Sequence, residues 1–132
     1  MNTLRPAVVI GAVALAGLGV APALAATAAK PTSLTLKASH TSVAPKAKDT
    51  LTATLRSGRT AVANESVKLE KRAAGAKSWT LVSAKTTNAK GQTSWSVVPG
   101  TKKGQKEQYE LVFSGNKSYK ASHSSIITVT VS

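Results

Sequence analysis

Residues 50–55 have the sequence Thr-Leu-Thr-Ala-Thr-Leu, in which a polar residue alternates with an apolar one at every step. This period of two places Leu51, Ala53 and Leu55 on one face of a strand and the threonines on the other. Threonine suits the solvated face of a pleated sheet. The segment therefore predicts a β-strand with one buried face.

The same alternation recurs after residue 32 and predicts seven short strands separated by turn residues. The turn signals are Ser57-Gly58, Pro99-Gly100 and Asn88-Ala89-Lys90-Gly91, the last expected to close a hairpin. Besides residues 50–55, the residues that carry the strands are Leu34, Leu36 and Ala38; Val67 and Leu69; Trp79 and Leu81; Thr93, Trp95 and Val97; Tyr109, Leu111 and Phe113; and Ile127, Val129 and Val131. Val43 is expected in an additional edge segment. The pattern predicts an all-β, immunoglobulin-like sandwich of two sheets and about seven strands.

The first 25 residues have the features of a cleavable secretory signal. Arg5 precedes an uncharged apolar run over residues 7–20, and Ala23-Leu24-Ala25 has the small-x-small pattern of a signal-peptidase site. The apolar run is shorter than the ~20 residues that span a bilayer. We therefore expect a signal peptide over 1–25, a flexible leader over 26–32, a single domain over 33–132 and a secreted product without a transmembrane anchor.

The composition combines a strong positive charge with a complete lack of cysteine. The chain has 18 Lys and Arg residues and five acids. Without Arg5, which lies in the signal, 17 cations face five acids and the net charge is +12. Because no disulfide can form, packing must stabilise the domain. The few aromatic residues are expected to pack structurally, with Trp95 inward, Trp79 half exposed and Tyr119 closing a loop through its hydroxyl.

The sequence gives no support to catalysis, metal binding or a cofactor. Asp49 is the single aspartate, and the glutamates are spread along the chain rather than clustered as calcium sites require. His40 and His123 are expected in loops as solvated residues, too few for a zinc site. No Gly-x-Ser-x-Gly elbow is present. We therefore expect a protein that is not an enzyme.

The cations are expected in loops at both ends of the sandwich. Because successive strands alternate in direction, alternate loops share an end. One end should collect Lys46, Lys48, Lys77, Lys102, Lys103 and Lys106, the candidate contacts to a polyanion. The other should collect Arg56, Arg59, Lys90, Lys117 and Lys120. No aromatic residue for base stacking lies among them, so sequence-specific binding of nucleic acid is not expected.

Three stretches resemble the bacterial immunoglobulin-like domains of exported actinobacterial proteins. They are residues 67–72 (Val-Lys-Leu-Glu-Lys-Arg) with Trp79 beyond, residues 86–92 (Thr-Thr-Asn-Ala-Lys-Gly-Gln), and residues 109–119 (Tyr-Glu-Leu-Val-Phe-Ser-Gly-Asn-Lys-Ser-Tyr) leading to the last strand. The resemblance covers essentially all of the chain after the signal. It implies a spacer or adhesion module and carries no catalytic residues.

Three functions remain open from the sequence. The first is a secreted, non-enzymatic binding or interaction module at the cell surface, whose basic loops weakly capture polyanions such as an anionic cell-wall polymer. The second is a structural cell-envelope component held to another surface protein along an edge strand. The third is a small secreted inhibitor or toxin that acts through the loop from Arg72 to Ser78. Lysine on exposed strands also discourages pairing between sheets, so the charge could serve solubility alone.

The charge predicts a salt-dependent stability. Cations that repel one another destabilise the compact state, and added salt screens this repulsion over a Debye length of ~8 Å at 0.15 M. We expect the melting temperature to rise between low salt and ~0.15 M sodium chloride. Differential scanning calorimetry measures it, and a flat or falling melting temperature would contradict the prediction.

Overall fold

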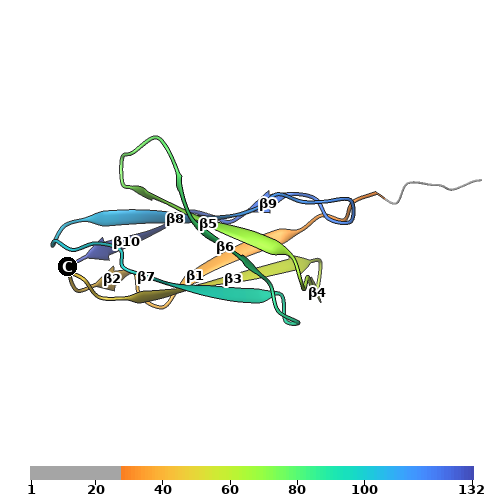
Figure 1. The fold of residues 1–132 in the computed structure, drawn as a ribbon, viewed down its shortest axis with the longest axis horizontal. Helices are drawn as coiled ribbons and strands as arrows, with labels where there is room; N and C mark the ends of the chain where they lie inside the picture. Colours follow the sequence, from red (N-terminus) through yellow and green to blue (C-terminus); the bar gives the residue numbers. More distant parts are fainter. Residues whose placement is uncertain (1–27) are drawn as a thin grey trace, which may run out of the picture.

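The structure, a computed structural model, describes residues 28–132, which form ten strands in two sheets and no helix. The all-β, two-sheet architecture predicted from the sequence is confirmed (Figure 1). The predicted signal peptide, residues 1–25, lies outside the described residues. In the described part, no helix is long and apolar enough to cross a membrane.

β3 (Asp49–Ser57) is the central strand of the first sheet. One edge of β3 pairs antiparallel with β1 (Ser33–Ala38). Its other edge pairs antiparallel with β7 (Gln92–Val97) and, beyond the end of β7, with β4 (Thr60–Ala61). The backbone N–H and C=O groups of β3 are therefore hydrogen-bonded on both edges along most of the strand.

The second sheet has β8 near its centre. Its strands follow the order β2 (Ser42–Val43), β10 (Ile127–Val131), β8 (Lys106–Phe113), β5 (Ser66–Ala73) and β6 (Thr80–Thr86), with β9 (Ser122–His123) also on β8. β2 pairs in parallel with β10, whereas the other neighbours are antiparallel. β6 pairs only with β5 among the described strands, so it is an edge.

The core lies between the two sheets and consists of the alternating apolar residues. Leu51, Ala53 and Leu55 of β3 are fully buried, as are Leu69 of β5 and Leu111 of β8. The other residues expected to face inward are also buried, namely Leu34, Leu36, Val67, Trp95, Val97, Tyr109, Phe113, Val129 and Val131. Ala38 and Ile127 are partly buried against this core. β1, β3, β5, β7, β8 and β10 therefore each contribute one apolar face, as the period of two predicted.

The edge position of β6 changes the environment of the fourth predicted strand. Leu81 is 54% exposed and Val82 is 37% exposed. Leu69 pairs with Ser83 and Glu70 with Leu81, so Val82 is an extra residue that forms a bulge in the edge strand. Leu81 lies in the strand that the sequence predicted, but its side chain does not contribute to the core.

All seven predicted strands are present, as β1, β3, β5, β6, β7, β8 and β10. The described residues contain three more, each of two residues: β2, β4 and β9. β2 contains Val43, for which the sequence predicted an edge segment. The other two are too short to show an alternation, and only their pairing defines them.

The turn at residues 88–91 does not close a hairpin, which corrects the prediction made from its sequence. β6 pairs with β5 in the second sheet, whereas β7 pairs with β3 in the first, so the turn crosses between sheets. Its local chemistry is as expected: Gly91 has φ +74°, and its N–H donates to the Asn88 carbonyl at 2.9 Å. The Asn88 Oδ1 accepts from the N–H groups of Lys90 and Gln92. Turn chemistry fixes the reversal but not the partner of the next strand.

Polar side chains link the two sheets where β6 and β7 approach each other. The Trp95 Nε1–H donates to the Ser83 Oγ at 2.8 Å. The Lys85 Nζ donates to the Ser94 carbonyl at 2.8 Å and lies 6.0 Å from the centre of the Trp95 ring. These bonds join β6, an edge strand of the second sheet, to β7, an edge strand of the first, along one side of the sandwich.

Part of the segment expected to be a flexible leader is held against the domain. Lys30 forms a parallel bridge with Tyr119, its N–H donating to the Ser118 carbonyl at 2.9 Å and its carbonyl accepting from the Lys120 N–H at 2.8 Å. The Thr32 hydroxyl donates to the Lys120 carbonyl. Residues 30–32, which the sequence assigns to the leader, are thus hydrogen-bonded to a loop distant in sequence.

Replacement of Gly91 by alanine should destabilise the fold more than the same replacement at Gly58. Both glycines have positive φ, which costs an alanine about 1–2 kcal/mol. At Gly91 a new Cβ would also lie 2.5 Å from the Leu55 carbonyl oxygen, whereas at Gly58 it would meet no atom within 4 Å. We expect the free energy of unfolding, measured by urea denaturation, to fall at least 1 kcal/mol further in Gly91→Ala than in Gly58→Ala. Equal losses would show that the close approach to β3 does not matter.

Candidate functional site

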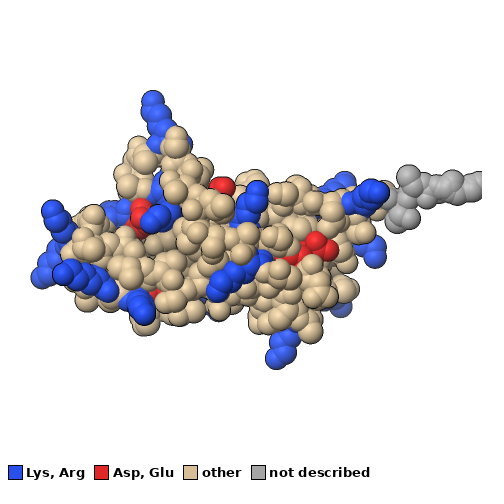
Figure 2. Space-filling view, in the orientation of Figure 1, with Lys and Arg blue, Asp and Glu red and all other residues tan. Residues whose placement is uncertain are grey.

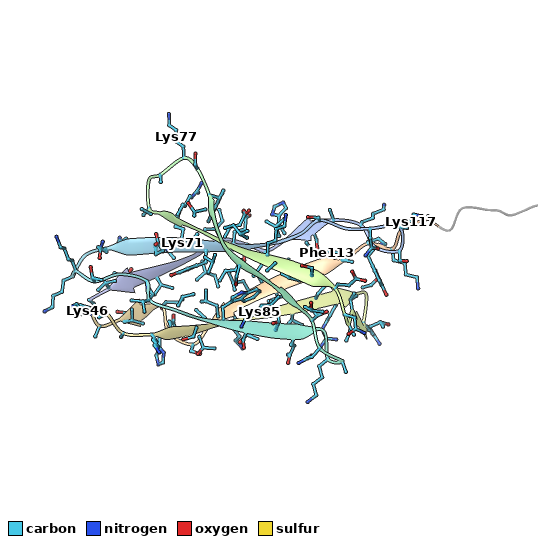
Figure 3. All side chains as sticks on the ribbon, in the orientation of Figure 1. Lys46, Lys71, Lys77, Lys85, Phe113 and Lys117 are labelled. Atoms are coloured by element: carbon cyan, nitrogen blue, oxygen red, sulfur yellow. The ribbon has the colours of Figure 1, made fainter. Side chains whose placement is uncertain are left out.

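The six candidate lysines lie in the half of the molecule that contains the C-terminus, and all six are exposed. Lys46 and Lys48 follow β2, Lys102 and Lys103 lie between β7 and β8, and Lys106 begins β8. Lys77 stands apart from the others, on a β5–β6 loop that projects from the sandwich (Figure 3). The structure thus brings five of the six to one end and places the sixth on a separate projection.

Hydrogen bonds fix the loop that carries Lys102 and Lys103. The Gln105 Oε1 accepts from the N–H groups of Thr101 and Lys102, at 2.7 and 2.8 Å. The Gly104 N–H donates to the Val131 carbonyl at 2.7 Å, which ties the loop to β10. The neighbouring loop is tied in as well, because the Lys46 N–H donates to the Gly100 carbonyl. These lysines are therefore long flexible side chains on a fixed backbone.

A pocket of about 350 Å³ at this end is not a purely basic site. Lys106 and Glu107 both line it, together with Ala73, Ala74, Pro99, Gly104 and Gln105. Burial raises the pKa of the Glu107 carboxyl, and nearby Lys71 partly offsets this. A carboxylate in the wall repels an anion, so this pocket does not favour an anionic ligand. Polyanion contact at this end would fall on the exposed lysines around it.

The opposite end is also basic, as Figure 2 shows by the blue surface at both ends of the molecule. Lys117 and Lys120 lie in the β8–β9 loop there. The β3–β4 hairpin, which contains Arg56 and Arg59, is tied to the same end because the Ser57 hydroxyl donates to the Pro31 carbonyl at 2.8 Å. Lys30 joins this end through its bridge with Tyr119. A pocket of about 330 Å³ is lined by Lys30, Lys117, Ser118 and Tyr119. The sequence placed Lys117 here but missed Lys30, which it assigned to the leader.

The predicted role of the Tyr119 hydroxyl in closing this loop is not what the structure shows. The Asn116 Oδ1 closes the loop instead, accepting from the N–H groups of Ser118 and Tyr119 at 2.9 and 3.0 Å. The Tyr119 ring is partly buried against the core. Tyr119 is held by its backbone bridge with Lys30 and by packing of its side chain against the core.

No group of three or more metal-ligating side chains occurs in residues 28–132, although two of the acids are paired across neighbouring strands. Asp49 is buried, and its Oδ1 accepts from the N–H groups of His40 and Thr50 at 3.0 Å. Glu70 and Glu110 face each other across β5 and β8. That pairing of like charges is unfavourable.

The two histidines are exposed, and each lies beside an acid. The His40 Nδ1 lies 3.6 Å from the Asp49 Oδ1, and the His123 Nδ1 lies 3.2 Å from the Glu110 Oε2. His40 is in a loop as expected. His123 belongs to β9, which corrects its assignment to a loop. β9 is only two residues long and has no alternation that the sequence could reveal.

The tryptophans have the structural environments predicted for them. Trp95 is buried, and Trp79 is partly exposed at the end of the β5–β6 loop. The Arg72 guanidinium lies 4.2 Å from the centre of the Trp79 ring, and its Nε–H donates to the Gln108 Oε1. Because Arg72 covers one face of the ring, Trp79 anchors the projecting loop to the sheet.

The cations of the described chain are not neutralised by ion pairs. Among residues 28–132, both contacts within 4.0 Å between a basic and an acidic side chain involve histidine, and neither involves Lys or Arg. The side chains of Lys85, Arg72 and Arg56 bond to neutral groups within the domain. The other lysine and arginine charges of this region are available to a ligand or to solvent. Exposed charges that lack a partner are the precondition for binding a polyanion.

Comparison with known proteins does not assign this chain. No family model matches the sequence, and neither a curated protein nor a solved structure matches it.

The buried Tyr109 should make the free energy of unfolding fall at alkaline pH. Burial, with the charges of Glu107 and Asp49 nearby, raises the pKa of its hydroxyl above the ordinary 10.0. Above pH 10 the unfolded chain loses this proton while the folded chain keeps it, so the free energy of unfolding falls by up to about 1.4 kcal/mol per pH unit. We expect Tyr109→Phe to remove this part of the decline in denaturation curves between pH 8 and 11. The control Tyr119→Phe retains Tyr109 and should show the same decline as the parent chain. Identical pH profiles for Tyr109→Phe and the parent chain would contradict the prediction.

Proposed function

We propose that this protein is a secreted, non-enzymatic binding module of immunoglobulin-like fold that captures anionic polymers at the cell surface through its basic loops. The observation that carries the proposal is the set of exposed lysines at the ends of a rigid sandwich, with no Lys or Arg ion pair among residues 28–132. Secretion rests on the signal pattern of residues 1–25.

The strand arrangement supports the immunoglobulin-like part of the proposal. β1, β3 and β7 form one sheet, and β10, β8, β5 and β6 form the other. The chain crosses between sheets after β1, β2, β4, β6 and β7, and two packed sheets with such crossings are typical of that fold.

The mechanism is attraction between point charges rather than recognition of a fixed geometry. Lysine outnumbers arginine heavily, and a lysine ammonium on a flexible stem does not form the planar bidentate contacts of arginine. Because the loop backbone is already fixed, binding does not require the loss of loop conformational entropy. The lysine side chains can still adjust to the positions of the negative charges on the polymer. Such binding is weak per contact and is screened by salt.

The experiment is a sodium chloride titration of the protein bound to purified cell wall of the producing organism. We expect binding to be lost between roughly 50 and 300 mM, because salt screens exposed charges over this range. Lys102→Gln/Lys103→Gln should bind more weakly than the parent at low salt. The matched control Lys37→Gln/Lys68→Gln removes the same charge from exposed strand positions outside the loops and should have a smaller effect. Retention that is insensitive to salt would contradict the proposal.

A second function is supported by β6. This edge strand has seven residues, all but one of them exposed, and carries a single charge, Lys85, whose ammonium is bonded to the Ser94 carbonyl. An unprotected edge can accept a strand from another protein, as the structural cell-envelope role requires. Binding that survives high salt but is lost in Ala84→Pro, which removes a backbone donor from the edge, would favour this role.

A further inference from the structure

The pocket between Lys30 and Lys117 differs from the pocket at the other basic end because no acid lines it. It has a volume of about 330 Å³ and combines two lysines with a hydroxyl, Ser118, and an aromatic ring, Tyr119. It lies at the end opposite the C-terminus, where Figure 3 labels Lys117. A pocket with a few convergent polar groups and one aromatic surface is the usual form of a small-ligand site.

The backbone around this pocket is held in place by bonds between segments distant in sequence. The Lys30 N–H donates to Ser118, and the Lys120 N–H donates back to Lys30. Within the loop, the Asn116 N–H donates to the Tyr119 carbonyl at 2.8 Å, and the Asn116 side chain bonds to Glu65 at 2.8 Å. The lysine backbones are thus arranged before any ligand arrives, which lowers the entropic cost of binding.

Gly115 makes this loop geometry possible. It has φ +81°, and a Cβ there would lie 2.6 Å from the Ala121 nitrogen. A side chain would force the two arms of the loop apart. The close approach of these arms places Ser118 and Tyr119 beside Lys30.

The charges around the pocket favour an anion. No acid lines it, in contrast to the pocket at the other end, whose wall contains Glu107. Glu65, the acid near this loop, accepts the amide of Asn116. Lys120, which bonds to Lys30, and the β3–β4 hairpin with Arg56 and Arg59, which bonds to Pro31 through Ser57, add positive charge at the same end. Tyr119, which is partly buried against the core, lines the pocket together with the two lysines and supplies an aromatic surface there.

We propose that this pocket binds an acidic sugar unit, the hexuronic acid residue of an anionic polysaccharide. Lys30 and Lys117 pair with the carboxylate, Ser118 bonds to a ring hydroxyl, and Tyr119 packs against the apolar face of the sugar ring. The inference rests on the proposed capture of polyanions and adds a selectivity that diffuse charge cannot give. The lysines at the C-terminal end then strengthen attachment of the same polymer without selecting it.

The test titrates glucuronate into the isotope-labelled protein and follows its backbone amide resonances by NMR. We expect saturable shifts confined to residues 30–32 and 115–121, with glucose and inorganic phosphate binding at least about tenfold more weakly. Lys117→Gln and Tyr119→Leu, which keeps an apolar side chain in the core, should each weaken glucuronate binding about tenfold. Lys102→Gln removes the same charge at the other end and should leave it unchanged.

Two outcomes would overturn the pocket assignment. One is phosphate binding as tightly as glucuronate, and the other is equal weakening by Lys117→Gln and Lys102→Gln. Binding of polyglucuronate at low salt, measured in parallel, separates the two proposals. If the polymer binds but the monomer shows no site, the pocket inference fails alone. If neither binds, the capture of polyanions fails with it.

Discussion

Packing between the inner faces of the two sheets stabilises this domain, because a chain without cysteine has no disulfide to hold them together. β3 contributes three fully buried side chains, and its backbone is paired on both edges. The loops at the two ends depend on this arrangement, since each begins and ends on strands whose register the buried residues fix.

The placement of charge follows from the same constraint. Two of the five acids, Asp49 and Glu107, lie at the end of the core, where Asp49 caps backbone N–H groups and burial disfavours the ionised form of Glu107. The lysines, by contrast, remain in solvent. Acids placed in this way do not neutralise the surface, so the domain keeps a net positive field at some cost to its own stability.

The period of two was enough to predict the strands and nearly all of the core, because burial on one face imposes the alternation directly. It could not reveal polar residues that are buried for their hydrogen bonds. Thr87 bonds to Val62 and Glu65, and the Ser124 hydroxyl accepts from the Leu111 N–H. Such positions depend on partners distant in sequence. The same is true of the crossing from one sheet to the other at residue 91 and of the pocket lined by Lys30.

The parallel pairing of β2 with β10 determines how these strands would respond to a force along the long axis of the domain. The described N-terminal segment and the C-terminus lie at opposite ends of an elongated body (Figure 1). β2 runs parallel to β10, with the Thr130 and Ser132 N–H groups bonded to the Thr41 and Val43 carbonyls. A tension applied between the two ends would act along these strands, and their evenly spaced bonds would then be loaded together instead of one after another. A module anchored at one end and attached to a polymer at the other would be loaded along this axis.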